Sequence, residues 1–312
     1  MENKPIRIGT RGSQLALYQA EKVKEAIDAR FPEIKSELVV IKSKGDKILD
    51  VALSKIGDKG LFTKELEQAM FDDEVDLAVH SLKDLPTHLP EGLKLGGVLK
   101  RGEVRDALVS TKKIKLTDLT SDNTIATSSL RRKAQLLSIN PDFTIIDIRG
   151  NVNTRLRKME EGHCDVMLMA AAGLQRIGLD HYISEVIDPY QIIPAVSQGA
   201  IAMEIRTNDS RIASIVQEVN HPLTEVATRA ERVFLRKLEG GCQIPIGCYS
   251  SIQNDTITMN GFMAYIDGTN VISHSMQGKL PEADQLASDL ADYFISQGSK
   301  KLLERIRIYN NE

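Results

Sequence analysis

Short apolar runs alternate with stretches of helical periodicity over the first two thirds of the chain, and no other property of the sequence limits the fold as strongly. Helices are predicted between the apolar runs, the first of them capped by Ser13 and continuing to Arg30. The runs typical of strands lie at 6–9, 37–42, 76–80, 93–99, 107–110, 124–127, 144–149 and 166–170. Strands that alternate with helices of this length predict βαβ units and a largely parallel sheet, repeated in two lobes.

The last third changes character at a long predicted helix, residues 222–239. Pro222 stands at its first position, and Gly240 and Gly241 follow its end, as is typical of helix boundaries. Three consecutive runs typical of strands then lie at 246–252, 256–266 and 270–278. A series of strands backed by helices predicts a small α+β domain with an antiparallel sheet.

Composition narrows the possible partners of the 312-residue chain. A net charge of -3, 4% aromatic residues and no Trp argue against nucleic acid and anionic membrane surfaces. The three cysteines, Cys164, Cys242 and Cys248, include no CxxC pair, so we expect neither a disulfide framework nor a metal site. No stretch approaches the roughly 18 apolar residues of a membrane span, and no signal-peptide core precedes the first strand. A cytoplasmic location is therefore expected.

Arginines stand at strand-to-helix junctions, where the positive end of the helix dipole disfavours cations. They are Arg11 before the Ser13 cap, Arg131 and Arg132 after Ser129, Arg149 at a strand end, and Arg155 in a helix capped by Asn151 or Asn153. Such recurrence favours a bound anion, although solvated surface arginines remain the alternative. Because these junctions lie at the carboxyl ends of strands, they are predicted to share one ligand edge. Several separate arginines suit a small molecule with several carboxylates, and the missing phosphate-loop motifs argue against nucleotides.

One acidic and one basic residue follow the apolar run at 76–80. Pro86 disfavours helix at Leu85, so Lys83 and Asp84 are predicted to lie on an irregular turn at a strand end. They form either an ordinary surface pair or a site in which Asp84 faces a cleft, stabilising a cation or moving protons.

Cys242 stands just beyond a predicted helix end, after two glycines and before Pro245. A helix C-terminus raises a thiol pKa, so any reactivity would have to come from nearby cations. A special role for Cys242 and an ordinary loop position both remain open. Cys164 and Cys248 fit buried core positions. The lysine- and glycine-rich segment 42–60 is either a solvated loop or a lid over an anionic ligand.

Several of these segments together resemble the hydroxymethylbilane synthase family, also called porphobilinogen deaminases. The matching motifs are IGTRGSQLA at 8–16, HSLKDLP at 80–86, SSLRR at 128–132, IRGNVNTR at 148–155, AAAGLQR at 170–176, ERVFL at 231–235 and GCQIP at 241–245. The resemblance runs from about residue 5 to the C-terminal helix. Its departures are slight, with Leu82 where Met is common and Cys164 where an aromatic residue is common.

The resemblance implies a transferase of tetrapyrrole (haem) biosynthesis. Such an enzyme joins four porphobilinogen molecules head to tail, releases ammonia, and hydrolyses the product to 1-hydroxymethylbilane. By resemblance, Cys242 holds a dipyrromethane cofactor through a thioether and Asp84 is catalytic. The implied cofactor binders are Asp84, Lys83, Ser129, Arg131, Arg132 and Arg155. The implied substrate binders are Arg11, Ser13, Arg149, Arg155, Arg176 and Gln198, with Thr127 a weaker candidate and Lys55 and Lys59 on the lid.

The fold implied by the resemblance is α/β, with two lobes like those of type II periplasmic binding proteins and a small C-terminal α+β domain. The first lobe is discontinuous, with residues 1–99 and 200–219; the second takes 100–199, and the C-terminal domain takes 220–312. A monomer is expected. The rival hypothesis is a non-catalytic two-lobed anion-binding protein, which would explain the arginines but neither the loop of Cys242 nor the third domain.

Overall fold

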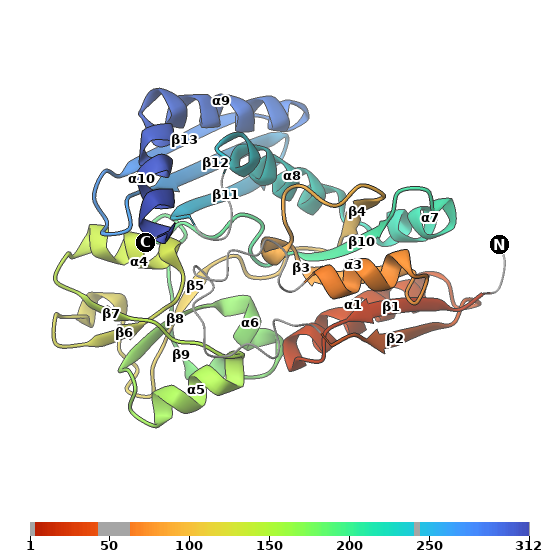
Figure 1. The fold of residues 1–312 in the computed structure, drawn as a ribbon, viewed down its shortest axis with the longest axis horizontal. Helices are drawn as coiled ribbons and strands as arrows, with labels where there is room; N and C mark the ends of the chain where they lie inside the picture. Colours follow the sequence, from red (N-terminus) through yellow and green to blue (C-terminus); the bar gives the residue numbers. More distant parts are fainter. Residues whose placement is uncertain (1–3, 43–62, 240–243, 312) are drawn as a thin grey trace. The chain divides into compact units, whose positions relative to one another are not determined.

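The computed structural model describes residues 4–42, 63–239 and 244–311, and the chain divides into two compact units (Figure 1). Of the described residues, the first unit takes in 4–42, 63–102 and 199–225. The second takes in 103–198, 226–239 and 244–311. The chain therefore leaves the first unit, builds part of the second, and returns.

The first unit is built on one five-stranded sheet. Its elements are β1 (Ile6–Thr10), α1 (Gln14–Arg30), β2 (Ser36–Val40), α3 (Lys64–Phe71), β3 (Leu77–Ser81), η2 (Leu82–Asp84), β4 (Leu93–Val98), β10 (Ile201–Arg206) and α7 (Ser210–Val219). The strand order is β2-β1-β3-β10-β4. β1 pairs in parallel with β2 and β3, whereas β10 is antiparallel to both of its neighbours. Only β10, which enters the sheet after the chain returns, runs against the others.

Helices cover both faces of this sheet because its strands carry apolar side chains on both sides. Ile8 and Val79 pack in one buried cluster with Ile27 of α1 and Ile215 of α7, while Ala78 points to the opposite cluster around α3. Helix α1 begins where predicted, with the Ser13 hydroxyl accepting a hydrogen bond from the Ala16 amide at 3.3 Å.

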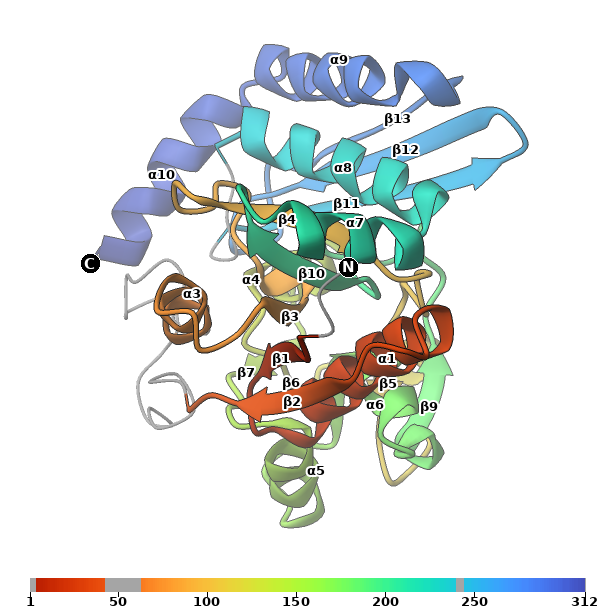
Figure 2. The ribbon, with the colours of Figure 1, turned by 90° about the vertical axis from the view of Figure 1, so that its right-hand side faces the viewer.

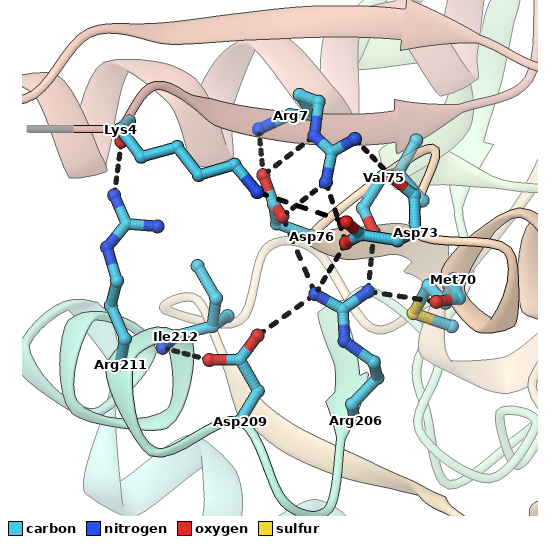
Figure 3. A network of polar contacts seen from close by, with 10 residues as sticks. All are labelled: Lys4, Arg7, Met70, Asp73, Val75, Asp76, Arg206, Asp209, Arg211 and Ile212. Atoms are coloured by element: carbon cyan, nitrogen blue, oxygen red, sulfur yellow. Dashed lines mark hydrogen bonds and ion pairs between the residues drawn. The ribbon is translucent and has the colours of Figure 1, made fainter. Parts of the chain in front are cut away.

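A polar network closes the edge of the sheet where β1 and β3 begin (Figure 3). Asp76, just before β3, accepts hydrogen bonds from the Arg7 backbone amide and guanidinium, both at 2.8 Å. Because β10 runs the opposite way, its carboxyl end brings Arg206 to the same edge, where it pairs with Asp209 at 3.0 Å. Burial alone would raise the pKa of Asp76, but the hydrogen bonds from Arg7 outweigh it and hold that pKa below its usual value.

Asp76→Asn is expected to lower the free energy of unfolding of the first unit by about 2–4 kcal/mol, since it leaves Arg7 facing a neutral group in a buried site. Asp73 is the matched control. It pairs with the same Arg7 at 2.9 Å, but its side chain is 65% exposed against 4% for Asp76. Asp73→Asn should cost less than about 1 kcal/mol. Urea dependence of hydrogen exchange at the amides of β1 and β3 measures both values.

The stability difference between wild type and Asp76→Asn should depend on pH. The folded pKa of Asp76 lies below the unfolded value of about 3.9, so its contribution is present above that pH and is lost as the pH falls. The difference between wild type and Asp76→Asn should therefore shrink below about pH 4. A difference that stays constant down to pH 3 would contradict this account of Asp76.

The second unit contains two sheets. Its elements are β5 (Asp106–Val109), η3 (Leu116–Asp118), β6 (Thr124–Ala126), α4 (Leu130–Ile139), β7 (Thr144–Ile146), α5 (Val152–Glu160), β8 (Val166–Ala170), α6 (Ala171–Arg176), η4 (Asp180–Tyr182), β9 (Ile183–Val186), most of α8 (Pro222–Lys237), β11 (Ile246–Gln253), β12 (Thr256–Met263), β13 (Ile272–Lys279), η5 (Leu280–Glu282), α9 (Ala283–Ser296) and α10 (Ser299–Asn311). One sheet has the order β7-β6-β8-β5-β9, with β5 antiparallel to both neighbours. It thus repeats the arrangement of the first unit.

The other sheet of the second unit, β11-β12-β13, is antiparallel throughout. Helix α9 runs along it (Figures 1 and 2). Phe234 of α8 and Phe294 of α9 meet edge to face at 5.1 Å in its core. A Cβ at Gly261 of β12 would lie only 2.8 Å from Phe294, so this close packing requires glycine.

The predicted fold class is confirmed: α/β lobes, the first of them discontinuous, with a separate antiparallel sheet near the C-terminus. The reversed strands β10 and β5 depart from an all-parallel arrangement. Among the described α-helices and strands, five were not predicted: α6, β9, β10, α7 and α10. The predicted domain boundaries remain a prediction. Within the described residues, no helix is both long enough and apolar enough to cross a membrane.

Candidate active site

Two of the predicted segments lie at one edge of the sheet in the first unit. β1 and β3 are parallel neighbours, so Arg11, just after β1, and the turn after β3 both stand at the carboxyl edge. The Gln19 side chain of α1 donates a hydrogen bond to the Ser81 hydroxyl at 2.8 Å and ties the helix to the end of β3. Ser13 lies at the same edge, where its hydroxyl caps α1.

Asp84 is displayed on a short, well-anchored turn, the single 3-10 turn η2. Leu82 and Leu85 on either side of it are buried, and the Leu82 amide donates to the Ala200 carbonyl at 3.0 Å. Asp84 itself is exposed, and within the described residues its carboxylate has no hydrogen bond or ion pair. The buried leucines anchor the turn, and the exposed Asp84 carboxylate that it presents can contact a ligand. Lys83 is half-buried and contacts other groups.

Three helices of the second unit begin at a common sheet edge. β6 is parallel to both β7 and β8, so α4, α5 and α6 all start from the carboxyl ends of neighbouring strands. Ser129 caps α4 by accepting from the Arg132 amide at 3.4 Å, and Thr127 accepts from the Ser129 amide at 3.3 Å. Asn151 caps α5 by accepting from the Thr154 amide at 2.9 Å, which decides between the two predicted caps.

Arg131 and Arg132 share one buried carboxylate, that of Asp106 at the start of β5. Arg131 donates to Oδ2 at 2.8 Å and Arg132 donates to Oδ1 at 2.7 Å. Their second contacts are backbone carbonyls, Ile193 at 2.6 Å and Leu168 at 3.1 Å. Two guanidiniums and one carboxylate leave one positive charge uncompensated. The Nε of Arg132 is also buried without a hydrogen-bond partner within the described residues.

The electrostatics of this group follow from burial. Burial alone would raise the pKa of Asp106, but the charges of Arg131 and Arg132 outweigh it and hold that pKa well below the usual range. For Arg131, burial is the largest effect and lowers its pKa, while Asp106 opposes the shift. The arginines remain cations, and a further anion beside them would be stabilised.

The remaining arginines lie near the ends of β7 and β8. Burial lowers the pKa of Arg149, with Asp147 opposing the shift, and within the described residues its guanidinium has no hydrogen bond or ion pair. Arg155 of α5 donates from Nε to the Gly150 carbonyl at 2.8 Å. Gly150 has φ +115°, and a Cβ there would lie 2.5 Å from Thr154, so this junction needs glycine. Arg176 ends α6, half-buried and in contact with other groups.

Three predicted site residues, Cys242, Lys55 and Lys59, lie outside the described residues. Gln198 is fully buried, and its side-chain nitrogen donates to the Val104 carbonyl and to Asp106, both at 2.8 Å. Within the described residues, no group of acidic, His and Cys side chains could hold a metal ion.

The sequence did not predict the buried carboxylates of Asp106 and Glu204. The one local sign of Asp106 is its position, because it is an acidic residue directly before the predicted strand 107–110. Glu204, fully buried in β10, lies 3.0 Å from Nε2 of the buried His80, so each of these polar side chains has a partner inside the sheet. The core positions of Cys164 and Cys248 are observed, and burial raises the pKa of the Cys164 thiol to about 11.

These features define an α/β protein with a separate antiparallel sheet near its C-terminus, in which arginines stand near the carboxyl ends of strands in each unit. The chain belongs to the porphobilinogen deaminase family. The family model described as "Porphobilinogen deaminase, dipyromethane cofactor binding domain" matches residues 6–214, and that of the family's C-terminal domain matches 226–296.

Full-length relatives agree with the family models. The chain is 46% identical over 309 residues to the porphobilinogen deaminase of Carboxydothermus hydrogenoformans, covering 99% of each chain. It is 47% identical over 303 residues to that of Desulforamulus reducens, covering 97% of this chain and 98% of the relative.

Likenesses to solved structures are much weaker. The periplasmic VFT2 domain of BvgS from Bordetella pertussis gives a TM-score of 0.41 at 11% identity, covering 70% of this chain and 86% of that one. The aliphatic sulphonate binding protein SsuA from Escherichia coli gives 0.40 at 15% identity, covering 77% and 71%. We draw no conclusion from likenesses at this level.

The predicted family, the transferase class and the dipyrromethane cofactor are thereby confirmed, and the non-catalytic alternative is not favoured. The residues present also fit such a group, whose pyrroles carry carboxylate side chains. Within the described residues, the excess positive charge of Arg131 and Arg132, the buried Nε of Arg132 without a partner and the partly buried Arg149 without a salt bridge all favour added carboxylates.

Proposed function

We propose that this chain condenses four porphobilinogen molecules head to tail on a dipyrromethane held by Cys242, releasing ammonia and then 1-hydroxymethylbilane. Membership of the porphobilinogen deaminase family supports the reaction. The single structural observation that carries the proposal is the buried pair Arg131 and Arg132, which shares one carboxylate and is left with an excess positive charge.

The cofactor's carboxylates are assigned to residues at the two carboxyl edges: Lys83, Ser129, Arg131, Arg132 and Arg155. Cys242 supplies the thioether. When bound, the dipyrromethane supplies the free pyrrole carbon to which the first substrate is joined. The chain's part is to hold that group still, since guanidiniums can bind each carboxylate through two parallel hydrogen bonds.

The acetate and propionate of incoming porphobilinogen are assigned to Arg11, Arg149, Arg155 and Arg176, with Ser13 beside them. Arg149 is a candidate because its guanidinium is partly buried, which lowers its pKa, and within the described residues it makes no hydrogen bond or salt bridge. A substrate carboxylate would give the Arg149 guanidinium a charged hydrogen-bond partner. Lys55 and Lys59 are proposed to contact carboxylates from the lid segment.

Asp84 is proposed as the catalytic residue. When ammonia leaves the aminomethyl group of porphobilinogen, positive charge spreads to the ring nitrogen. A carboxylate that accepts a hydrogen bond from that N–H stabilises the charge as it develops. The bond from the aminomethyl carbon to ammonia would be replaced by a bond from the same carbon to the free pyrrole carbon, and the pyrrole that supplied that carbon would lose its proton there and regain aromaticity. Asp84 has the freedom this role needs, because its carboxylate is exposed on the anchored turn η2.

We further propose that the enzyme works in the cytoplasm as a monomer, without nucleic acid or membrane partners. The net charge of -3 and the three cysteines without a CxxC pair support this proposal. An oligomer in sedimentation analysis at micromolar concentration would contradict the monomer.

Arg149→Gln is expected to raise the KM for porphobilinogen about 10- to 100-fold, because it removes a charged partner of a substrate carboxylate. It should not lower the melting temperature, since within the described residues the Arg149 guanidinium has no hydrogen bond or salt bridge to lose. Arg157→Gln is the matched control, an exposed arginine of α5 whose Nε lies 3.8 Å from Glu161. Equal KM values for both variants would contradict the role of Arg149.

The proposed function is tested by mixing purified protein with porphobilinogen and measuring ammonia and tetrapyrrole. We expect both products, and colour when the protein alone is treated with an acidic aldehyde reagent for pyrroles. A protein that binds porphobilinogen without releasing ammonia, and gives no colour, would instead be an anion-binding protein.

A further inference from the structure

The turn at Ser197 and Gln198 is buried and conformationally strained. Ser197 has φ +63°, a left-handed conformation that residues other than glycine adopt only when their surroundings hold them. Both residues are fully buried. Such strain is concentrated at functional sites, so the contacts that maintain it are informative.

Two buried carboxylates hold this turn from different elements. Glu231 of α8 accepts a hydrogen bond from the Ser197 amide at 2.6 Å. Glu231 also binds Ser250 of β11, accepting from its amide at 2.9 Å and from its hydroxyl at 2.7 Å. The backbone of the turn is thus fixed against the domain that carries Cys242 in its sequence.

The second carboxylate is Asp106, which connects the turn to the arginine pair. Its Oδ1 accepts from both Gln198 and Arg132, at 2.8 and 2.7 Å, while its Oδ2 accepts from Arg131. With three donors on two oxygens, the carboxylate has one orientation. That orientation in turn fixes both guanidiniums, since each donates a single charged hydrogen bond to it.

We propose that Asp106 and Gln198 are positioning residues that orient Arg131 and Arg132 for the carboxylates of the dipyrromethane. This rests on the proposed role of the two arginines as cofactor binders. It gives Gln198 a supporting role in place of the substrate contact that the family resemblance implies, because the Gln198 side chain is buried and its nitrogen already donates to Val104 and Asp106.

Balancing the charges of Arg131 and Arg132 does not by itself explain why they share the single carboxylate of Asp106. A group built only to balance charge would supply a carboxylate for each arginine, whereas here one carboxylate takes one N–H from each. The uncompensated charge stays available to a ligand. Guanidiniums already held in place lose less rotational freedom when that ligand binds.

The test compares cofactor loading in purified Asp106→Asn, Asp106→Glu and Gln198→Ala, measured by intact mass on the folded fraction. Asp165→Asn is the matched control, since Asp165 accepts from Lys112 at 2.9 Å in the same unit but contacts neither arginine. We expect Asp106→Asn to carry about one tenth of the wild-type cofactor or less, Asp106→Glu to regain part of it, and the folded fraction of Gln198→Ala, which loses two buried hydrogen bonds, to lose severalfold. The control should load fully.

Full loading of folded Asp106→Asn would overturn the inference. If that variant does not fold, Gln198→Ala decides, because it leaves both ion pairs in place: full loading overturns the inference and reduced loading supports it. A wild type without added mass would contradict the cofactor proposal instead. The nitrogen NMR signal of Arg132 Nε then tests positioning alone, and an unchanged signal in Gln198→Ala would overturn it.

Discussion

Asp84→Asn is expected to lower kcat by about 10²- to 10³-fold while changing the KM for porphobilinogen less than about threefold. Asparagine keeps the size of the side chain but not its charge, so substrate binding survives while the cation formed on loss of ammonia goes unstabilised. The anchored turn of Leu82 and Leu85 should keep its conformation, since Asp84 makes none of the contacts that hold it. Steady-state kinetics with porphobilinogen measures both constants.

Glu91→Gln is the matched control for this change. Glu91 is an exposed carboxylate in the same unit, outside every predicted motif, and its loss should leave kcat unchanged. A near-normal kcat for Asp84→Asn would remove Asp84 from the catalytic role. A rise in KM with an unchanged kcat would reassign it to substrate binding.

Cys242→Ala is expected to abolish turnover and to give a chain whose intact mass equals that of its sequence alone. The reason is covalent: a thioether needs the sulfur, and binding through the arginines would not hold the growing chain over four condensations. Cys164→Ala is the control, because Cys164 is buried and its thiol pKa is raised to about 11, which makes it a poor nucleophile. It should keep both the added mass and the activity.

An added mass that persists in Cys242→Ala would contradict the anchor. Turnover without added mass would contradict covalent anchoring itself, while leaving the condensation reaction intact. The two outcomes are separable because mass and activity are measured on the same purified sample.

Local periodicity predicted most of the fold, and β10 illustrates why one element was missed. β10 carries Glu204 in the middle of an apolar run, and only its partner His80, far away in sequence, makes that charge acceptable inside the sheet. The tertiary contact that stabilises this strand is not visible in its own sequence.

For the candidate site, the sequence predicted the positions of residues along the chain but not their tertiary contacts. The strand-to-helix junctions are local features, so the positions of Arg11, Arg131 and Arg149 and the cap formed by Ser13 could be derived from the sequence. The partner that Arg131 and Arg132 share could not, because Asp106 precedes them by about 25 residues and meets them only through the order of the strands. The family resemblance named Gln198 but not its contact with Asp106.

Peptide mapping of the purified wild-type chain after brief exposure to porphobilinogen tests the central claim most directly. The chain offers three cysteines: Cys164 lies in a tryptic peptide of its own, whereas Cys242 and Cys248 share the peptide 238–279, so fragmentation of that peptide is needed to tell them apart. We predict that fragmentation places the dipyrromethane mass on Cys242 and that Cys164 and Cys248 are unmodified. Pyrrole mass on either of the other two cysteines, or on none, would contradict the account.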